Sequence, residues 1–252
     1  MILDGARALV TGSSRGIGRA IALRLAQEGA RIAVHYRDQR AAAEQTLGSL
    51  HGSGHALVHA DLSQPGAARL LVEASLKALE GLTIVVNNAG IYRLHPPETT
   101  PAREWEQTWG TTLAVNLLGP AHVSYWAARH MIEHGGGRLI NISSRGAFRG
   151  EPEAPAYGAS KAALNALSQS MAKALAGRRV LVFVIAPGWV ETDMALPHLQ
   201  AEQGDAVRSQ SPLDRIAAPE EIAEVALFLA SSAPETMTGS IIDVNGASYL
   251  RT

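Results

Sequence analysis

A tyrosine and a lysine four residues apart are the clearest sign of chemistry in this sequence. Tyr157 and Lys161 stand in one predicted helix, and a spacing of four places both side chains on the same face. A free tyrosine has a pKa of about 10 and is a weak acid–base catalyst near neutrality. A nearby ammonium lowers that pKa enough only in a partly closed site, because water screens the charge. The pair therefore indicates an acid–base site, with an unrelated Tyr and Lys on an amphipathic helix as the alternative.

A serine upstream of this pair could act on the same substrate. Ser144 comes two residues after the strand-like run 138–142. Ligands of parallel α/β sheets bind beyond the carboxyl ends of the strands. We therefore expect the hydroxyls of Ser144 and Tyr157 to reach one carbonyl oxygen, although a serine at a strand end can also simply cap a turn.

A glycine-rich turn follows the first strand-like run and opens the first helical stretch. Glycines at such a turn allow the backbone to approach a pyrophosphate closely, and the helix N-terminus supplies free N–H groups. The spacing is Gly-x-x-x-Gly-x-Gly, and an ordinary strand–helix turn is the alternative. The residues predicted to contact a dinucleotide here are Gly12, Ser14, Arg15, Gly16, Ile17 and Gly18.

The end of the second strand-like run bears on which dinucleotide binds. NAD-binding folds place an acid there for the ribose 2′-hydroxyl, but this chain has Tyr36 followed by Arg37. Two guanidiniums, Arg15 and Arg37, could clamp a 2′-phosphate through charge-assisted hydrogen bonds. The sequence thus favours NADP(H). Asp38 leaves the NAD alternative open, since a shift of one or two residues would put an acid in that place.

These candidate residues sit on a regular alternation of short apolar runs and longer helical stretches. Several runs are continuously apolar, which indicates strands covered on both faces, as in a parallel sheet. The alternation predicts an α/β fold: one doubly wound, Rossmann-type domain with a seven-stranded parallel sheet and helices on both faces. Predicted strands are 6–10, 31–36, 55–59, 83–86, 138–142, 180–186 and 241–244, and predicted helices are 17–27, 39–50, 67–79, 104–134, 157–176 and 220–229.

Length and composition agree with a single globular unit. The 252 residues are 46% hydrophobic and carry a net charge of −1, which does not indicate nucleic-acid binding. We expect one domain over residues 1–252, with the aperiodic segment 191–211 as a substrate lid or as a plain irregular connection. The absence of cysteine excludes thiolate chemistry, and scattered histidines indicate no metal site. Without a basic leader or an apolar run of roughly 18 residues, a cytoplasmic protein with no membrane contact is expected.

At this point the chain resembles the short-chain dehydrogenase/reductase family over nearly its whole length, nearest the 3-oxoacyl-[acyl-carrier-protein] reductase-like branch. The resemblance rests on motifs that occur in order and at family spacing. They are Thr11-Gly12-x-x-x-Gly16-x-Gly18, Asn87-Asn88-Ala89-Gly90, Asn116 in Val115-Asn116-Leu117, Ser144, Tyr157-x-x-x-Lys161 and Pro187-Gly188-x-x-x-Thr192.

The resemblance implies a role for each catalytic residue. Tyr157 would protonate the carbonyl oxygen as hydride arrives, and Ser144 would hydrogen-bond that oxygen. Lys161 would hold the nicotinamide ribose and lower the tyrosine pKa. Asn116 would fix a helix kink and a proton-relaying water.

The resemblance also implies the remaining contacts. Cofactor contacts would come from Tyr36, Arg37, Asp61, Leu62, Asn88, Ala89, Gly90, Tyr157, Lys161, Pro187, Gly188, Val190 and Thr192, and the substrate pocket from Arg145, Trp189 and Met194. Arg145 is bulky and charged for a pocket wall, so a solvent-facing side chain is its alternative.

Taken together, an NADPH-dependent oxidoreductase that reversibly reduces a carbonyl to a secondary alcohol is the expected function. A small-molecule carbonyl or alcohol is the expected substrate, and the resemblance implies a homotetramer. The alternatives are a 3-oxoacyl-[acyl-carrier-protein] reductase, a sugar or polyol dehydrogenase, and a dinucleotide-sensing regulator without catalysis.

Overall fold

The computed structural model describes residues 1–193, 195 and 204–251. Its centre is one sheet of order β3-β2-β1-β4-β5-β6-β7 in which every neighbouring pair is parallel. This confirms the predicted doubly wound fold, and each predicted strand is correct to within one residue at either end. The strands are β1 (Arg7–Val10), β2 (Arg31–Tyr36), β3 (Ala56–His59), β4 (Ile84–Asn87), β5 (Gly137–Ile142), β6 (Val180–Pro187) and β7 (Ile241–Val244).

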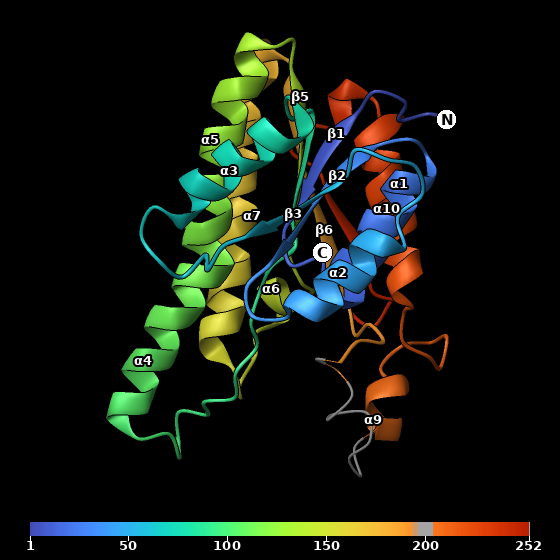
Figure 1. Ribbon diagram of the computed structural model, residues 1–252. Helices are drawn as coiled ribbons and strands as arrows, with labels where there is room; N and C mark the ends of the chain where they lie inside the picture. The colour runs from blue at the N-terminus through green and yellow to red at the C-terminus, as the bar shows by residue number, and fades with distance from the viewer. Residues whose placement is uncertain (194, 196–203, 252) are drawn as a thin grey trace.

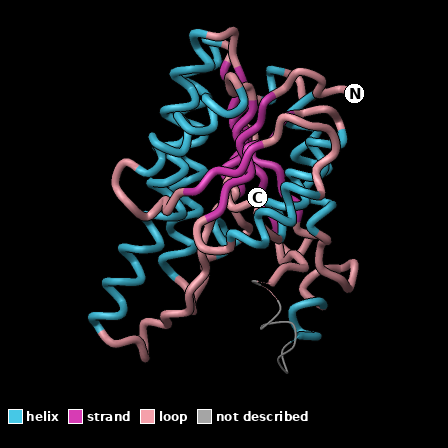
Figure 2. The backbone as a smooth tube through the Cα atoms, viewed as in Figure 1, coloured by secondary structure: helices cyan, strands magenta, loops and turns pink. Residues whose placement is uncertain are grey.

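Helices cover the sheet in two layers (Figure 1). Helices α1, α2 and α10 lie on one side, and α3, α5 and α7 lie on the other; Figure 2 shows the strands enclosed between them. The described α-helices are α1 (Gly16–Gln27), α2 (Arg40–Gly48), α3 (Ala67–Leu79), α4 (Ala102–Leu113), α5 (Gly119–Glu133), α6 (Gly146–Arg149), α7 (Pro155–Leu175), α9 (Gly204–Arg208) and α10 (Pro219–Ser231).

Two apolar cores explain why the strands read as continuous hydrophobic runs. In β1, Val10 packs into the core beneath α1 and α10, whereas Leu9 packs into the core beneath α3 and α5. All eight residues of β6 are buried. A strand covered on both faces has no solvent side on which to place polar residues.

The predicted long helix 104–134 contains an irregularity in its middle. Helices α4 and α5 are joined by η1 (Ala114–Leu118), a short π-helical segment that holds Asn116. Pro120 lacks the N–H that would bond the Asn116 carbonyl in a regular helix. The helix adopts wider π-helical turns over these residues. Short π segments of this kind often occur at functional sites.

Two short helices, α6 and α9, were not predicted. They contain only 4 and 5 residues, too few for a helical period to register in the sequence. Helix α9 falls inside the segment 191–211 expected to be a lid, which also includes residues 194 and 196–203 outside the described part of the chain. The lid therefore stays a prediction. Among the described residues, no helix combines the length and apolar character required to cross a bilayer.

Candidate active site

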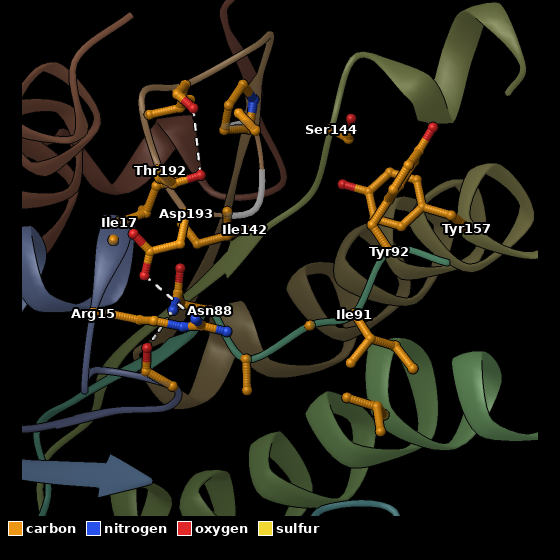
Figure 3. A pocket seen from close by; sticks show the side chains of 18 of the residues that line it. Arg15, Ile17, Asn88, Ile91, Tyr92, Ile142, Ser144, Tyr157, Thr192 and Asp193 are labelled. Carbon is orange, nitrogen blue, oxygen red and sulfur yellow. Dashed lines mark hydrogen bonds and ion pairs between the residues drawn. The ribbon is translucent and has the colours of Figure 1, made fainter. Parts of the chain in front are cut away.

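One cleft of about 380 Å³ opens at the carboxyl ends of the central strands. The glycine turn after β1 lines one end, and Ser144, Tyr157 and Lys161 line the other. Figure 3 shows Arg15, Ile17 and Asp193 on one side of this space and Ser144, Tyr92 and Tyr157 on the other. Strands β1 and β4 are neighbours here although β2 and β3 lie beyond β1. This reversal of strand order is where doubly wound sheets bind ligands.

The glycine turn requires glycine at each of its three positions. Gly12 and Gly16 have φ values of +64° and +55°, in the left-handed region that other residues avoid. A Cβ atom on Gly18 would stand 2.3 Å from the Gly12 carbonyl oxygen. The first turn of α1 has no side-chain cap, so its free N–H groups remain available to an anion in the cleft.

Buried side chains hold this turn in place. The Gly12 N–H donates to Nδ1 of His35 at 2.9 Å, and Nε2 of His35 lies 3.0 Å from the Ala60 carbonyl oxygen. Burial lowers the pKa of His35 to about 4, so the ring is neutral and accepts at Nδ1 while it donates at Nε2. Asn88 Nδ2 donates to the carbonyl oxygens of Thr11 and Gly12 at 2.9 and 3.1 Å.

His35 was not among the predicted site residues. The signal that could have indicated it is a polar side chain near the end of an apolar strand, the first strand after the glycine turn and α1, since β2 reads Arg-Ile-Ala-Val-His-Tyr.

The two arginines expected near a 2′-phosphate each meet an aspartate. Arg37 Nε lies 2.5 Å from Asp38 Oδ2, and Arg15 Nη1 lies 3.3 Å from Asp193 Oδ2. The Arg15–Asp193 side chains are 60% and 59% exposed and the Arg37–Asp38 side chains 46% and 62%, so both guanidiniums can exchange partners with an anionic ligand at low cost. Asp38 thus faces the neighbouring arginine in this structure.

Ser144 and Tyr157 meet at the other end of the cleft. Ser144 lies just beyond β5 and accepts the Gly146 N–H at 3.0 Å, while Tyr157 lies in the first turn of α7. Burial raises the pKa of Tyr157 to about 12; a side-chain hydrogen bond from Ser144 acts to lower it, and the Glu151 carboxylate raises it further. At neutral pH the phenol is therefore protonated.

Lys161 departs from the expected arrangement. Its ammonium donates to the Ile142 carbonyl oxygen at 2.7 Å and lies 5.7 Å from the centroid of the Tyr157 ring. Burial lowers the pKa of Lys161 to about 8. The sequence analysis expected this lysine to lower the pKa of Tyr157. The net shift is upward instead, because burial of the phenolate is the largest effect.

Asn116 lies behind the cleft. Its Oδ1 accepts the Ile91 N–H at 2.8 Å, and its Nδ2 donates to the Ile91 carbonyl oxygen at 2.9 Å and to Ser160 Oγ at 3.2 Å. The side chain therefore ties the π-helical segment to the chain after β4 and to α7.

The substrate end also contains residues that the sequence analysis did not single out. The Tyr92 ring packs edge-on against Tyr157 at 4.9 Å between centroids. Arg149 Nε lies 3.5 Å from Glu151 Oε1, and all three side chains line the cleft. Tyr92 and Glu151 belong to loops, and Arg149 ends the four-residue helix α6. None of them lies in a periodic pattern, so only their position between recognisable motifs could have indicated them.

The structure brings most of the predicted residues to this one cleft. Gly18 and Asn116 support its wall from behind, and Met194 lies outside the described residues. Arg145, one of the predicted pocket residues, is buried and does not face solvent. In the described part of the chain, no group of three or more His, Asp or Glu is placed to hold a metal ion. The predicted residues that line the cleft are Gly12, Ser14, Arg15, Gly16, Ile17, Tyr36, Arg37, Asp61, Leu62, Asn88, Ala89, Gly90, Ser144, Arg145, Tyr157, Lys161, Pro187, Gly188, Trp189, Val190 and Thr192.

Comparison with known proteins agrees with this geometry. A family model described as Enoyl-(Acyl carrier protein) reductase matches residues 12–247. The chain is 38% identical over 250 residues to the 3-oxoacyl-[acyl-carrier-protein] reductase FabG of Aquifex aeolicus (strain VF5), covering 98% of both chains. It is 36% identical over 252 residues to a short-chain type dehydrogenase/reductase of Picea abies, covering 97% of this chain and 92% of that one.

A solved structure is similar over the same range. The angucycline C-6 ketoreductase LanV, with bound NADP, superposes with a TM-score of 0.87 at 35% sequence identity, covering 98% of this chain and 96% of LanV. The glycine turn, the Ser144–Tyr157–Lys161 cluster and these relatives agree: the chain belongs to the short-chain dehydrogenase/reductase family of oxidoreductases, in its 3-oxoacyl-[acyl-carrier-protein] reductase-like branch.

Proposed function

We propose that this oxidoreductase is an NADPH-dependent ketoreductase that reversibly converts a carbonyl to a secondary alcohol, with Tyr157 as the general acid. The observation that carries the proposal is the meeting of Ser144 and Tyr157, two hydroxyl donors, in the same cleft as an uncapped glycine turn. One carbonyl oxygen can accept from both hydroxyls while its carbon faces the cofactor end.

The cleft fits a nicotinamide dinucleotide phosphate. The left-handed glycines and the free N–H groups of α1 suit a pyrophosphate, and Arg15 and Arg37 suit a 2′-phosphate because their present aspartate partners are exposed. The LanV structure with bound NADP supports the same cofactor. When bound, NADPH supplies the hydride that reduces the carbonyl carbon.

Tyr157 supplies the proton. Because its pKa is raised to about 12, the phenol keeps its proton at neutral pH and can give it to the oxyanion that forms on the substrate. Ser144 hydrogen-bonds the same oxygen and steadies the developing charge. In the oxidative direction the phenolate is needed, so the same pKa favours reduction at neutral pH.

Lys161 and Asn116 support this step. The buried ammonium of Lys161, with its pKa lowered to about 8, is a positive charge beside the place where an oxyanion and a phenolate form. A Cβ atom on Gly90 would stand 3.6 Å from Lys161 Nζ and 3.4 Å from Asn116 Oδ1. The Gly90 backbone thus lies close to both side chains, and a cofactor that contacts Gly90 comes near Lys161 and Asn116.

The function is tested by following NADPH oxidation with a panel of ketones, including β-ketoacyl thioesters, quinones, ketoses and steroids. We expect at least one ketone to be reduced by the native enzyme and not by Tyr157→Phe. A dinucleotide-sensing regulator would bind NADPH with the same affinity and reduce none of them. That result would overturn the proposal.

A second candidate, reduction of 3-oxoacyl groups on acyl carrier protein, is favoured by the similarity to FabG. Acyl carrier protein is acidic, so its reductases need basic docking residues. Arg178 and Arg179 after α7 are exposed, but α5 ends on the acidic Glu133, with Arg129 and His130 about one turn earlier. We therefore expect little preference for the carrier-bound thioester over a short thioester, measured as kcat/KM at low and high salt.

The homotetramer and the cytoplasmic location stay predictions. Two large side chains on the η1–α5 surface, Leu118 and Tyr125, are about half exposed, and Phe228 on α10 is 40% exposed. These apolar side chains on two separate faces suit subunit contacts. Light scattering at micromolar concentration should give four times the chain mass, and a monomeric mass would contradict the assembly.

A further inference from the structure

Arg145 is a charged side chain enclosed in the wall of the substrate end. Only 3% of its surface is exposed, and it follows Ser144 directly in the chain. It lines the main cleft and, together with Trp189, also lines an adjoining cavity of about 60 Å³. Its backbone N–H donates to the Pro187 carbonyl oxygen at 2.9 Å, which fixes the base of the side chain beside β6.

The guanidinium is only partly satisfied. Nη2 donates to the side-chain oxygen of Gln210 at 2.5 Å. Nη1 is buried and has no hydrogen-bond partner within the described part of the chain. None of the ion pairs found among the described residues includes Arg145. A neutral amide oxygen is thus the only acceptor that this buried cation meets among those residues.

The neighbouring charges leave the arginine in need of an anion. Glu151 is the acid whose charge acts on the Arg145 guanidinium and raises its pKa. Its carboxylate, however, already lies 3.5 Å from Arg149 Nε. Three cations, Arg145, Arg149 and Lys161, therefore share this end of the cleft with the single anion Glu151. Burial lowers the pKa of Arg145 to about 10, and Arg149 lowers it further, yet the guanidinium is charged at neutral pH.

A buried charge without a counter-ion is costly in a folded protein. A ligand of opposite charge can offset this cost. A cleft that contains ionisable groups with shifted pKa values is therefore a candidate recognition site. A guanidinium also matches a carboxylate in shape and donor geometry. Arg145 and Ser144 line the same cleft, so a ligand that reaches Ser144 is close to this charge.

We propose that Arg145 is a specificity-determining residue that selects ketones carrying a carboxylate, which its unpaired Nη1 binds while Ser144 and Tyr157 hold the carbonyl oxygen. The proposal rests on the ketoreductase function above and names its substrate class. The competing occupant of the space is an ordered water, which the 60 Å³ cavity is large enough to hold.

Binding is measured first, because it does not depend on turnover. Benzoate and benzamide have nearly the same shape and differ in charge. By calorimetry on the NADPH-saturated enzyme, we expect benzoate to bind at least about tenfold more tightly than benzamide, as a charge-assisted hydrogen bond allows. Arg145→Gln should remove that preference, and Arg145→Lys, which keeps the charge, should retain part of it.

Turnover is then compared for 3- and 4-acetylbenzoate and the matching acetylbenzamides. The expected result is a higher kcat/KM for the acids, carried mainly by KM, which Arg145→Gln cancels. Arg208→Gln is the matched control: it removes one charge from the nearby helix α9, where Arg208 pairs with Asp205, and should leave the acid–amide ratio unchanged. Thermal unfolding of each variant verifies that it is folded.

The outcomes separate this inference from the ketoreductase function. Equal binding of benzoate and benzamide to the native enzyme, or a preference that survives in Arg145→Gln, would overturn the carboxylate site while ketone reduction stands. If no ketone is reduced, the proposed function fails, and a benzoate preference that depends on Arg145 would still support the anion site. If Arg145→Gln does not fold, Arg145→Lys carries the test: a benzoate preference below that of the native enzyme would support the site, and an unchanged preference would overturn it.

Discussion

The two ends of the cleft are built on opposite principles. At the cofactor end, neutral groups satisfy one another: Gly12 bonds to an uncharged His35, and Asn88 bonds to two carbonyl oxygens of the turn. At the substrate end, Tyr157, Lys161 and Arg145 are ionisable groups whose pKa values are displaced from their ordinary range. The glycine turn keeps its shape through these bonds without a ligand, whereas Arg145 Nη1 at the substrate end has no hydrogen-bond partner among the described residues.

This difference follows from what each end has to do. A pyrophosphate needs a surface of fixed shape with free N–H groups, which a rigid backbone provides best. Proton transfer and recognition of a reacting molecule need groups that change partner or charge, and these are costly to bury until the ligand arrives. The cofactor end should therefore respond to mutation through stability, and the substrate end through turnover and pH dependence.

Tyr157→Phe should have the largest effect, and it acts only at the substrate end. The variant lacks the proton donor, so kcat should fall by at least about 1,000-fold, within the range assigned to acid–base catalysis. NADPH affinity, measured by fluorescence titration, should stay within a few fold because the glycine turn is untouched. Tyr125→Phe on the surface of α5 is the control, and a normal kcat in Tyr157→Phe would refute the mechanism.

His35→Phe tests the cofactor end and should act through stability. The folded-state pKa of His35 is lowered to about 4 from 6.5, so its stabilising contribution is complete above pH 6.5 and is lost as pH falls towards 4. This pKa difference corresponds to about 3 kcal/mol of unfolding free energy in the native protein.

The variant should lose that part of the pH dependence, measured by urea unfolding between pH 4 and 7. It should also be less stable at pH 7, because the Gly12 N–H is left without its acceptor. The exposed His51, changed to Gln, is the control. An unchanged pH dependence in His35→Phe would show that other groups account for it.

Arg37→Ala and Arg15→Ala should change cofactor choice by about tenfold each in the ratio of NADPH to NADH affinity, as expected for one exposed charge-assisted contact. Arg40→Ala on α2, where Arg40 pairs with Glu44, should leave the ratio unchanged. Titration of both cofactors is the measurement. Equal affinities for NADPH and NADH in the native enzyme would remove the role of both arginines.

Glu151→Gln should have the smallest effect on turnover. It tests whether charges at the substrate end set the pH dependence of the reaction. The Glu151 carboxylate raises the pKa of Tyr157, so its loss should let the phenol ionise at lower pH. The alkaline limb of the reduction rate should move down by less than about one pH unit. Glu153→Gln, an exposed neighbour, is the control, and a limb that moves upward would contradict the sign.

Local patterns were sufficient for the framework of this protein. Strand β2 was predicted with its observed bounds because polar residues flank its apolar run and mark where the buried strand begins and ends. The glycine turn was predicted because left-handed backbone, found at Gly12 and Gly16, strongly favours glycine and so leaves a mark in the sequence. Helical spacing placed Tyr157 and Lys161 on one face, and the family resemblance implied their roles.

Other features required the fold. The role of the Asn116 side chain depends on its contact with Ile91, 25 residues away, and the role of His35 depends on its approach to Gly12 and Ala60. Glu151 and Tyr92 come from loops without a period, and their nearness to Tyr157 arises only when the loops after β4 and β5 meet at one edge of the sheet.

The sequence by itself therefore determined the sheet and the glycine turn, and it put forward Tyr157 and Lys161 as the acid–base pair, since each of these is signalled by a local pattern. The tertiary structure decided the charge states. Whether Lys161 or desolvation governs the pKa of Tyr157, and whether Arg145 faces solvent or lies buried, depends on how much water the packed loops exclude. Burial of a charge is a property of the whole surrounding surface, and no local pattern in the chain encodes it.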